Sequence, residues 1–534
     1  MDQLSPQDAQ FLYLETPDNL THLTSVSIFD QSTVPGGEVV RFRDILTHVE
    51  SRLHMSPIFK RRLVHVPLEL DFPYWVDDEH FDLEYHVRHG RLPEPGDWRQ
   101  FCIHVARYHS RPLDMNRPLW EMYVVEGLDN VDWLPKGSYA LLTKIHHAAV
   151  DGKAIMDFFG ALADIDNKGT PAVPLNTARL RRSPKPGLID MAVRAAWHTV
   201  RSPLGMMDAV MRSAPSVYNK AQHVLSSQKE EQTQVPDTRF NHDVSPHKMF
   251  GAKAYRLDDF KAIRQAVPGS TINDVVLAVC GGALHRYLDK HQELPEDSLV
   301  AWVPINARQS SASEPDSPGN RVTSMTAPIF TDVADDIERL VCIHTATRLS
   351  KEAKSGVSAR LMTDLSQHVP AATQVLAGRL VLRAGLAART CNLFISNVPG
   401  PQVPLYMNGA LQVGAYGLAP LVNGMGLFIA TPSYNGEITF NVTSTRELLP
   451  DMDFFIECID AALDSMKAEI APKKARKKAA AKKPTKKAAE KSAKKTSKKR
   501  AKKTTRKTAK KASKASSKKP GTRKAPPAGD AGPT

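Results

Sequence analysis

Two adjacent histidines are the residues of this chain best suited to chemistry. Residues 146–152 read His-His-Ala-Ala-Val-Asp-Gly and follow an apolar stretch, 139–145, interrupted by Thr143 and Lys144. Neutral imidazole has the side-chain pKa nearest physiological pH, so a histidine here could take a proton and return it, which typically contributes ~10²–10⁴-fold to a rate. The segment therefore predicts general acid–base chemistry.

Neighbouring residues argue against two other chemistries. Side chains alternate along an extended chain, so His146 and His147 should point to opposite faces, and only one can face a reactive centre. Two ligands on opposite faces cannot close on one metal ion, and no HExxH motif or Cys/His cluster supplies others. A serine hydrolase is disfavoured, because no GxSxG segment is present. We therefore expect no metal site and a histidine that acts on an exogenous substrate.

The end of this segment is predicted to be a tight turn. Gly152 has no side chain and lets the turn close, and we assign Asp151 to holding it by an ion pair or hydrogen bonds rather than to proton transfer. The residue types alone leave a second interpretation open, in which the histidine pair is a structural or surface feature beside a strand.

The elements that must position this segment are predicted from hydrophobic periodicity. A strand at 138–145 ends at the histidines and a helix at 153–165 follows, and this alternation predicts an α/β fold. The other predicted elements are helices at 272–289 (capped by Ser270 or Thr271), 335–351 and 451–470, strands at 299–303 and 392–396, and an Asn435-Gly436 hairpin.

Length and composition divide the chain into four parts. Its 534 residues exceed the ~250–300 at which a single core stops growing. Pro-containing stretches flank a basic amphipathic segment at 188–224, which indicates a partly helical crossover. The expected parts are an N-terminal domain (1–175), a crossover linker (176–245), a C-terminal domain (246–471) and a tail (472–534).

The net charge of +14 combines two parts of opposite sign. Residues 472–534 contain 26 Lys and Arg and two acidic residues, which leaves 45 basic and 55 acidic residues in the rest. Without aromatic residues, the tail cannot bury enough apolar area to offset chain entropy, so it is predicted to be disordered. It resembles the tails of linker-histone-like proteins and could bind polyanions such as DNA or anionic lipid.

Cysteine usage and the chain start predict a cytoplasmic protein. The five cysteines are scattered without a CxxC spacing, and an odd number does not indicate a disulfide framework. The first residues lack the basic and apolar regions of a signal peptide, and no run of 18 apolar residues is present. We expect no membrane span.

The ordered motifs of the chain resemble those of a known family. The segment 146–152 resembles the HHxxxDG motif of the CoA-dependent acyltransferase superfamily, which includes chloramphenicol acetyltransferase and peptide-synthetase condensation domains. Four further motifs occur in order: Leu-Ser-Pro-Gln-Asp-Ala-Gln-Phe-Leu at 4–12, Arg-Pro-Leu-Trp-Glu at 117–121, Asn-Asp-Val-Val-Leu-Ala at 273–278 and Ser-Asn-Val-Pro-Gly-Pro at 396–401. Together they resemble the bacterial wax ester synthase/acyl-CoA:diacylglycerol acyltransferase family across roughly residues 1–468.

The resemblance implies a fold, a reaction and a catalytic residue. The fold would be two chloramphenicol-acetyltransferase-like domains with a tunnel between them, and the reaction transfer of a long-chain acyl group from acyl-CoA to diacylglycerol or a fatty alcohol. The second histidine of the motif, here His147, would be the general base. Acyl-CoA would be a co-substrate, and no cofactor is expected. A dry tunnel would favour transfer over thioester hydrolysis.

Supporting roles are predicted for other motif residues, each beside a simpler alternative. Asn273 either shapes the site or only caps the helix that it opens. Trp120 is expected in packing, with a place on the tunnel wall as the functional alternative. Ser396 and Asn397 either face the tunnel or form the turn that follows their strand.

The basic tail supports a competing hypothesis of a different class. In this hypothesis the protein is mainly a nucleic-acid-associated factor with a vestigial enzyme body. We disfavour it, because stacking aromatics and a recognisable nucleic-acid-reading fold are absent from the sequence. In a third hypothesis the tail tethers the enzyme peripherally to a membrane or to lipid inclusions, where its apolar substrates are.

Overall fold

The computed structural model describes residues 2–150, 158–169, 187, 189–195, 197, 235–306, 322–352 and 390–481. The chain comprises two units, Met1–Ala471 and Pro472–Thr534. All packing described below lies within the first unit.

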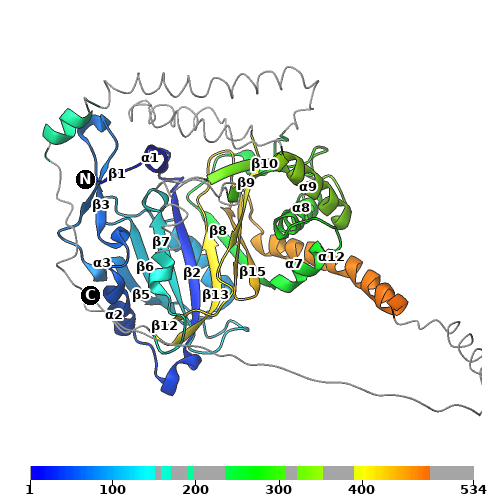
Figure 1. Cartoon of the computed structure of the whole chain (residues 1–534), viewed down its shortest axis with the longest axis horizontal. Helices are drawn as coiled ribbons and strands as arrows, with labels where there is room; N and C mark the ends of the chain where they lie inside the picture. The colour runs from blue at the N-terminus through cyan, green and yellow to red at the C-terminus, as the bar shows by residue number, and fades with distance from the viewer. Residues whose placement is uncertain are drawn as a thin grey trace, which may run out of the picture. The chain divides into compact units, whose positions relative to one another are not determined.

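A six-stranded sheet carries the histidine pair (Figure 1). Its strands, in spatial order, are β12 (Tyr406–Met407), β13 (Ala410–Leu418), β2 (His22–Asp30), β7 (Tyr139–His146), β6 (Trp120–Glu126) and β5 (Val87–Arg91). Strand β7 pairs antiparallel with both β2 and β6. The strand predicted at 138–145 is thus confirmed as β7, in the interior of the sheet.

Strands from distant parts of the sequence complete this sheet. β13 runs antiparallel to β2, with Tyr416 opposite Val26, and in Figure 1 the yellow β13 lies beside the blue β2. β12 extends the sheet beyond β13. Segments from beyond residue 400 therefore finish a sheet that begins at residue 22. The division into four parts by residue number stays a prediction.

Both faces of β7 are covered, and all of its residues are buried. Leu141 and Ile145 share one core cluster with Ile45 of α2 (Phe42–Arg52), whereas Leu142 packs on the opposite face with Phe101 of α4 (Trp98–His109). A strand buried on both faces is held rigidly, because any shift would open cavities in two cores. β7 therefore fixes the position of the residues at its end.

Short elements surround this sheet. They are the strands β1 (Asp2–Gln3), β3 (Arg61–Val64) and β4 (Tyr74–Asp77), the helices α1 (Pro6–Tyr13) and α3 (Leu83–His86), and the 3₁₀ turns η1 (Gln31–Thr33), η2 (Pro35–Gly37), η3 (Pro57–Phe59), η4 (Pro67–Glu69) and η5 (His147–Ala149). A further 3₁₀ turn, η7 (Arg239–Asn241), instead packs through Phe240 into the core of the later part of the chain. The three strands form a separate small sheet in the order β1-β4-β3. This small sheet fixes Asp2 and Gln3, because β1 pairs with β4.

A second six-stranded sheet is built from the later part of the chain. Its strands, in spatial order, are β10 (Val322–Pro328), β9 (Val300–Asn306), β11 (Leu393–Pro399), β14 (Phe428–Tyr434), β15 (Glu437–Thr445) and β8 (Lys248–Arg256). Asn435 and Gly436 join β14 to β15 with φ values of 45° and 84°. Both φ values are positive, as a two-residue hairpin turn requires, so the predicted hairpin is confirmed.

Among the described residues, four helices pack on the second sheet around one large core (Figure 1). They are α7 (Leu257–Arg264), α8 (Ile272–Lys290), α9 (Asp336–Glu352) and α12 (Met452–Ala481). Thr271 caps α8 in a reciprocal capping box with Asp274, which confirms the helix and one of its two predicted caps. Ser270 instead donates its hydroxyl to backbone carbonyls before the helix.

Two helices differ in extent from their predicted bounds. α12 continues to Ala481, past the end predicted at residue 470, because the Lys- and Ala-rich sequence that follows consists largely of good helix formers. The helix predicted at 153–165 is described only from residue 158, and it is helical up to residue 162. Most of the predicted linker and the tail beyond Ala481 lie outside the described residues.

None of the helices in the described part of the chain has both the length and the apolar character needed to cross a membrane.

Candidate active site

The histidine pair lies where β7 ends. His146 is the last residue of the strand, and its N–H donates to the carbonyl of Leu119 at 3.0 Å. His147 begins the turn η5, and its N–H donates to the carbonyl of Thr21 at 3.1 Å. The backbone of both histidines is thus held by the chain segments that lead into β6 and β2.

The ring of His146 is engaged at both nitrogens. Nδ1 accepts a hydrogen bond from the N–H of Ala148 at 3.0 Å, and Nε2 lies 2.5 Å from Oε2 of Glu15 and 3.1 Å from the hydroxyl of Thr21. A neutral imidazole has one N–H. Because Nδ1 is the acceptor, we assign the hydrogen to Nε2, where it is donated to the Glu15 carboxylate. The ring is fully buried, so it has no free nitrogen for a substrate.

The ring of His147 has a different environment. It stacks on Phe11 with ring centroids 3.8 Å apart and planes inclined by 15°. Its Nδ1 is buried without a hydrogen bond, and neither ring nitrogen bonds to another residue of the described chain. Burial lowers the pKa of His147 to about 4, an effect larger than the opposing one of its own backbone. The ring is therefore neutral at physiological pH and can accept a proton.

A small apolar cluster brings three of the sequence motifs together. α1 begins at Pro6 after the N-cap Ser5, whose hydroxyl accepts from the N–H of Asp8, and this helix carries Phe11 to His147. The buried members of the cluster are Leu4, Ala9, Leu63, Phe72, Leu119 and Ala148. Leu4 and Ala9 come from the first motif, Leu119 from the Arg-Pro-Leu-Trp-Glu motif and Ala148 from the histidine motif, so these three segments share one packing site.

Trp120 is a core residue. Its side chain is fully buried against Phe59 and Phe158, and Nε1 donates to the carbonyl of Phe59 at 3.1 Å. This placement agrees with the packing role expected for it. Its place on a substrate tunnel stays a prediction.

Of the remaining predicted residues, three lie in the second half of the chain and two lie outside the described residues. Asn273 is half-buried in the first turn of α8, and Ser396 and Asn397 are half-buried in β11, which continues to Pro399 in parallel pairing with β14. In the described part of the chain, no hydrogen bond, ion pair or ring contact joins these three residues to either histidine. Asp151 and Gly152 lie outside the described residues.

Comparison with known proteins identifies the family. Residues 4–276 match the wax ester synthase/diacylglycerol acyltransferase catalytic domain, and residues 318–467 match the C-terminal domain of the same family. The chain belongs to this acyltransferase family. The match spans both halves of the fold.

Individual relatives of this acyltransferase agree with the assignment. A Mycobacterium tuberculosis protein named as a diacylglycerol O-acyltransferase is 31% identical over 87% of this chain and 90% of its own length. The O-acyltransferase WSD of Acinetobacter baylyi is 30% identical over 89% of this chain and 99% of its own length. The solved wax ester synthase/diacylglycerol acyltransferase of Marinobacter aquaeolei VT8 is 27% identical, with a TM-score of 0.63 over 88% of this chain and 100% of that structure.

These matches confirm the predicted fold class and enzyme class. The acyltransferase has the two-domain, chloramphenicol-acetyltransferase-like α/β fold of its family, and it is an O-acyltransferase of a family that uses acyl-CoA. The competing hypothesis of a nucleic-acid-associated factor with a vestigial enzyme body finds no support in them. The described residues include no group of three or more His, Cys, Asp or Glu side chains placed to hold a metal ion.

The sequence did not predict two residues that contact the histidine pair of this candidate site. Glu15 and Thr21 contact His146, yet they lie outside the motif at 4–12. The four-residue spacing between Phe11 and Glu15 is not a helix-face signal, because α1 ends at Tyr13 and Glu15 lies beyond it. The spacing does not reveal a partner 131 residues away.

Asp274 is a third residue whose role the sequence did not predict. It is fully buried, and its carboxylate accepts hydrogen bonds from the N–H of Thr271 at 2.8 Å and from the hydroxyl of Thr347 at 2.9 Å. His344 lies 3.3 Å from the same carboxylate. Because Thr347 and His344 belong to α9, Asp274 ties the start of α8 to α9. Within the Asn-Asp motif, Asp274 therefore holds the helix on which Asn273 sits.

A buried polar cluster lies beside His146 on the same sheet. His22 is opposite His146 in the β2–β7 pair, and its Nε2 lies 2.6 Å from the carbonyl of His109. Nδ1 of His109 lies 2.8 Å from the hydroxyl of Thr24. Burial lowers the pKa of His22 well below its ordinary value and that of His109 to about 3. Both rings are therefore neutral in the folded protein near neutral pH.

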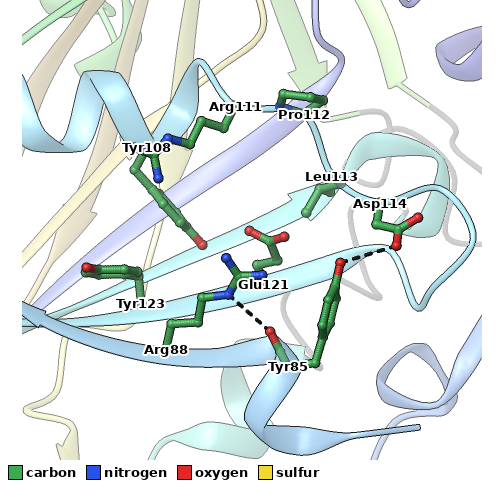
Figure 2. Close-up of a pocket in the computed structure, with 9 residues that line it drawn as sticks. All are labelled: Tyr85, Arg88, Tyr108, Arg111, Pro112, Leu113, Asp114, Glu121 and Tyr123. Atoms are coloured by element: carbon green, nitrogen blue, oxygen red, sulfur yellow. Dashed lines mark hydrogen bonds between the residues drawn. The ribbon is translucent and has the colours of Figure 1, made fainter. Parts of the chain in front are cut away.

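A cavity of about 330 Å³ lies elsewhere on the first half of the chain (Figure 2). Arg88, Arg111, Glu121 and Asp114 contribute charged groups to its lining, so it differs from the apolar tunnel that long acyl chains require. His147 is not among the lining residues. The substrate tunnel accordingly stays a prediction.

The buried neutral histidines make the stability of the fold depend on pH. His109 has an ordinary pKa of 6.5 when unfolded and a pKa of about 3 when folded. As the pH falls, the unfolded chain therefore binds a proton at a higher pH than the folded chain does. The free energy of unfolding then decreases below pH 6.5, by up to about 1.4 kcal/mol per pH unit for one such histidine. We expect His109→Gln to make the unfolding free energy, measured with urea at several pH values, depend less steeply on pH.

The matched control is His54→Gln, which changes an exposed histidine. Its slope between neutral and mildly acidic pH should equal that of the wild type. An equally steep slope in His109→Gln would show that the proton uptake on unfolding comes from other groups.

Proposed function

We propose that this acyltransferase moves a long-chain acyl group from acyl-CoA to a lipid alcohol, with His147 as the general base. One observation carries the proposal: His147 is held at the end of a rigid strand as a neutral ring with no hydrogen bond to another described residue. Its neighbour His146 has both nitrogens engaged. Of the two histidines of the motif, only His147 is thus available to a substrate.

The reaction follows from a neutral imidazole beside an alcohol and a thioester. A ring nitrogen of His147 takes the proton of the acceptor hydroxyl as its oxygen attacks the thioester carbonyl carbon. The tetrahedral intermediate then expels the sulfur, the C–S bond breaks, and the imidazolium returns the proton to the CoA thiolate. The products are an ester and CoA, and His147 is neutral again. The residues required are all on this chain, so we propose no metal or other cofactor.

The acceptor is proposed from the names of the relatives. Both diacylglycerol O-acyltransferases and a wax ester synthase are similar to this chain, so diacylglycerol, giving triacylglycerol, and a fatty alcohol, giving a wax ester, are the two acceptors to test. We propose that a tunnel between the domains admits both substrates. Trp120, Ser396, Asn397 and Asn273 are the residues assigned to its wall or its shaping, as the family motifs imply.

Replacement of the proposed base is the direct test. His147→Ala should lower transfer of labelled palmitate from palmitoyl-CoA by at least ~10², because general-base catalysis contributes that much, while the melting temperature stays near that of the wild type. The assay uses purified protein with diacylglycerol and with hexadecanol in parallel. Wild-type turnover in a folded His147→Ala protein would refute the assignment.

His146→Ala serves as the neighbouring comparison. This change removes a buried ring that binds Glu15 and Ala148, so we expect a lower melting temperature and a milder loss of rate than in His147→Ala. Total and equal loss of rate in both variants would contradict the division of roles between the two rings.

The turn that follows the histidines is proposed to depend on Asp151. We propose that its carboxylate holds the turn by a charge-assisted interaction, which Gly152 allows to close. Asp151→Asn should then reduce both the melting temperature and the transfer rate. A reduced rate with an unchanged melting temperature would instead indicate that Asp151 takes part in the chemistry.

The basic tail is proposed to bring the enzyme to anionic lipid. Each Lys or Arg near an anionic surface is worth about 1 kcal/mol, and residues 472–534 contain 26 of them. This attachment would place the enzyme in the cytoplasm at the surface of a membrane or of lipid inclusions, next to its apolar acceptor. DNA binding through the same charges is the outcome that the experiment below must distinguish.

Deletion of Pro472–Thr534 tests the tail. Turnover on detergent-dispersed substrate should stay near that of the full chain, because the buried residues of α12, such as Leu463 and Met466, precede the deletion. Turnover on vesicles containing anionic lipid should fall, and the difference from the full chain should shrink as salt rises, since salt screens the attraction. Vesicles of zwitterionic lipid are the control.

Two results would contradict this role of the tail. Equal activity of both proteins on anionic and zwitterionic vesicles would exclude a tether. Retention of the full chain on duplex DNA but not on anionic vesicles would assign the tail to nucleic acid.

A further inference from the structure

We propose that Glu15 is a positioning residue for the reaction: it fixes the tautomer of His146, and this tautomer holds the turn that carries His147. The proposal rests on the role of His147 proposed above. Its physical basis is a continuous chain of hydrogen bonds that runs from the Glu15 carboxylate through the His146 ring to the N–H of Ala148.

The first link is the contact between Glu15 and His146. Oε2 of Glu15 lies 2.5 Å from Nε2 of His146, whose side chain has no exposed surface, and the Glu15 side chain is only 16% exposed. A hydrogen bond to a carboxylate is roughly twice as strong as a neutral one. The carboxylate can only accept, so it selects the form of the ring that has its hydrogen on Nε2.

The second link is the contact between His146 and the turn. With the hydrogen on Nε2, Nδ1 has a free lone pair and accepts the N–H of Ala148 at 3.0 Å. In the other tautomer, Nδ1–H and the N–H of Ala148 would be two donors facing each other. Within the described part of η5, the N–H of Val150 reaches the carbonyl of His147 only at 3.4 Å. The shorter bond from Ala148 to His146 therefore supports the turn.

The segment that carries Glu15 is itself held in place. The chain reverses between Thr16 and Asn19, whose backbones exchange two hydrogen bonds, and returns to Thr21. The hydroxyl of Thr21 lies 2.8 Å from the carbonyl of Phe11 and 3.1 Å from Oε2 of Glu15. Glu15 thus meets His146 from a fixed position.

The same segment constrains both histidines. Phe11 stacks on the His147 ring, and Glu15, four residues later, holds the His146 ring. Loss of the Glu15 contact would leave Phe11 and the apolar packing in place, while it frees the ring that caps the turn. The expected consequence is a misoriented base and not an unfolded protein.

The test compares two replacements of Glu15. Glu15→Ala removes the acceptor and should lower kcat by ~10–100-fold, the range in which a misplacement of about 1 Å acts, with KM for palmitoyl-CoA unchanged. Glu15→Gln keeps an oxygen that can accept from Nε2–H, so it should retain most of the wild-type kcat. Equal losses of kcat in the two variants would overturn the proposal, because it attributes the loss to the missing hydrogen-bond acceptor alone.

Ser5→Ala is the matched control in the same segment. It removes the N-cap of α1, typically a loss of stability, but touches neither histidine. It should lower the melting temperature and leave kcat unchanged well below that temperature. If Ser5→Ala lowers kcat as much as Glu15→Ala does, Glu15 acts only through the stability of the segment, and the proposal is wrong.

A spectroscopic measurement tests the tautomer without reference to activity. The protein is labelled with ¹⁵N-histidine, and the His146 signals are assigned by their absence in His146→Asn. The wild type should show His146 with its hydrogen on Nε2, and Glu15→Ala should shift the population toward Nδ1–H. Nδ1–H in the wild type would overturn the proposal whether or not any Glu15 variant folds.

This readout separates the proposal from the function on which it rests. If His147→Ala is fully active, the assignment of the base fails, yet the ¹⁵N signals still report whether Glu15 sets the tautomer. If His147→Ala is inactive but Glu15→Ala has the wild-type kcat, the base stands and the positioning role is refuted.

Discussion

Strand β7 is hydrogen-bonded along both edges, to β2 and to β6, and the geometry of the site depends on this pairing. The strand is buried on both faces, so neither rotation nor a shift in register is available to it. The strand therefore fixes the positions of His146, its last residue, and of His147, which follows. The segments that precede β2 and β6 then bind their backbones through Thr21 and Leu119.

Burial has different consequences for the two histidine rings. His146 is buried with both nitrogens satisfied, so it stabilises the turn, whereas Nδ1 of His147 is buried without a hydrogen bond to any described residue, so the neutral form is favoured. The same desolvation makes the imidazolium that forms during proton transfer unfavourable. In the proposed mechanism this favours rapid return of the proton to the departing thiolate. The neutral His22 and His109 nearby add no positive charge to this region.

The site draws on chain segments that are far apart. The first twenty-one residues supply the ring that stacks on His147 and the carboxylate that binds His146. β13, from beyond residue 400, pairs with β2, whose other edge holds β7. The sheet that carries the histidine pair is thus complete only when both ends of the acyltransferase body have folded. This dependence couples formation of the site to formation of the whole first unit.

The sequence by itself determined the local elements and the family. β7, α8 and the Asn435-Gly436 hairpin follow from short-range causes, namely apolar periodicity, a Thr271 cap and a turn that needs positive φ. The ordered motifs were sufficient for the family, and they imply His147 as the base, which stays a prediction. Only the tertiary structure decided that Glu15 meets His146 across 131 positions, that Trp120 is enclosed in the core, and that β13 completes the first sheet. Such contacts depend on how the chain crosses between sheets, and neither residue spacing nor composition contains that information.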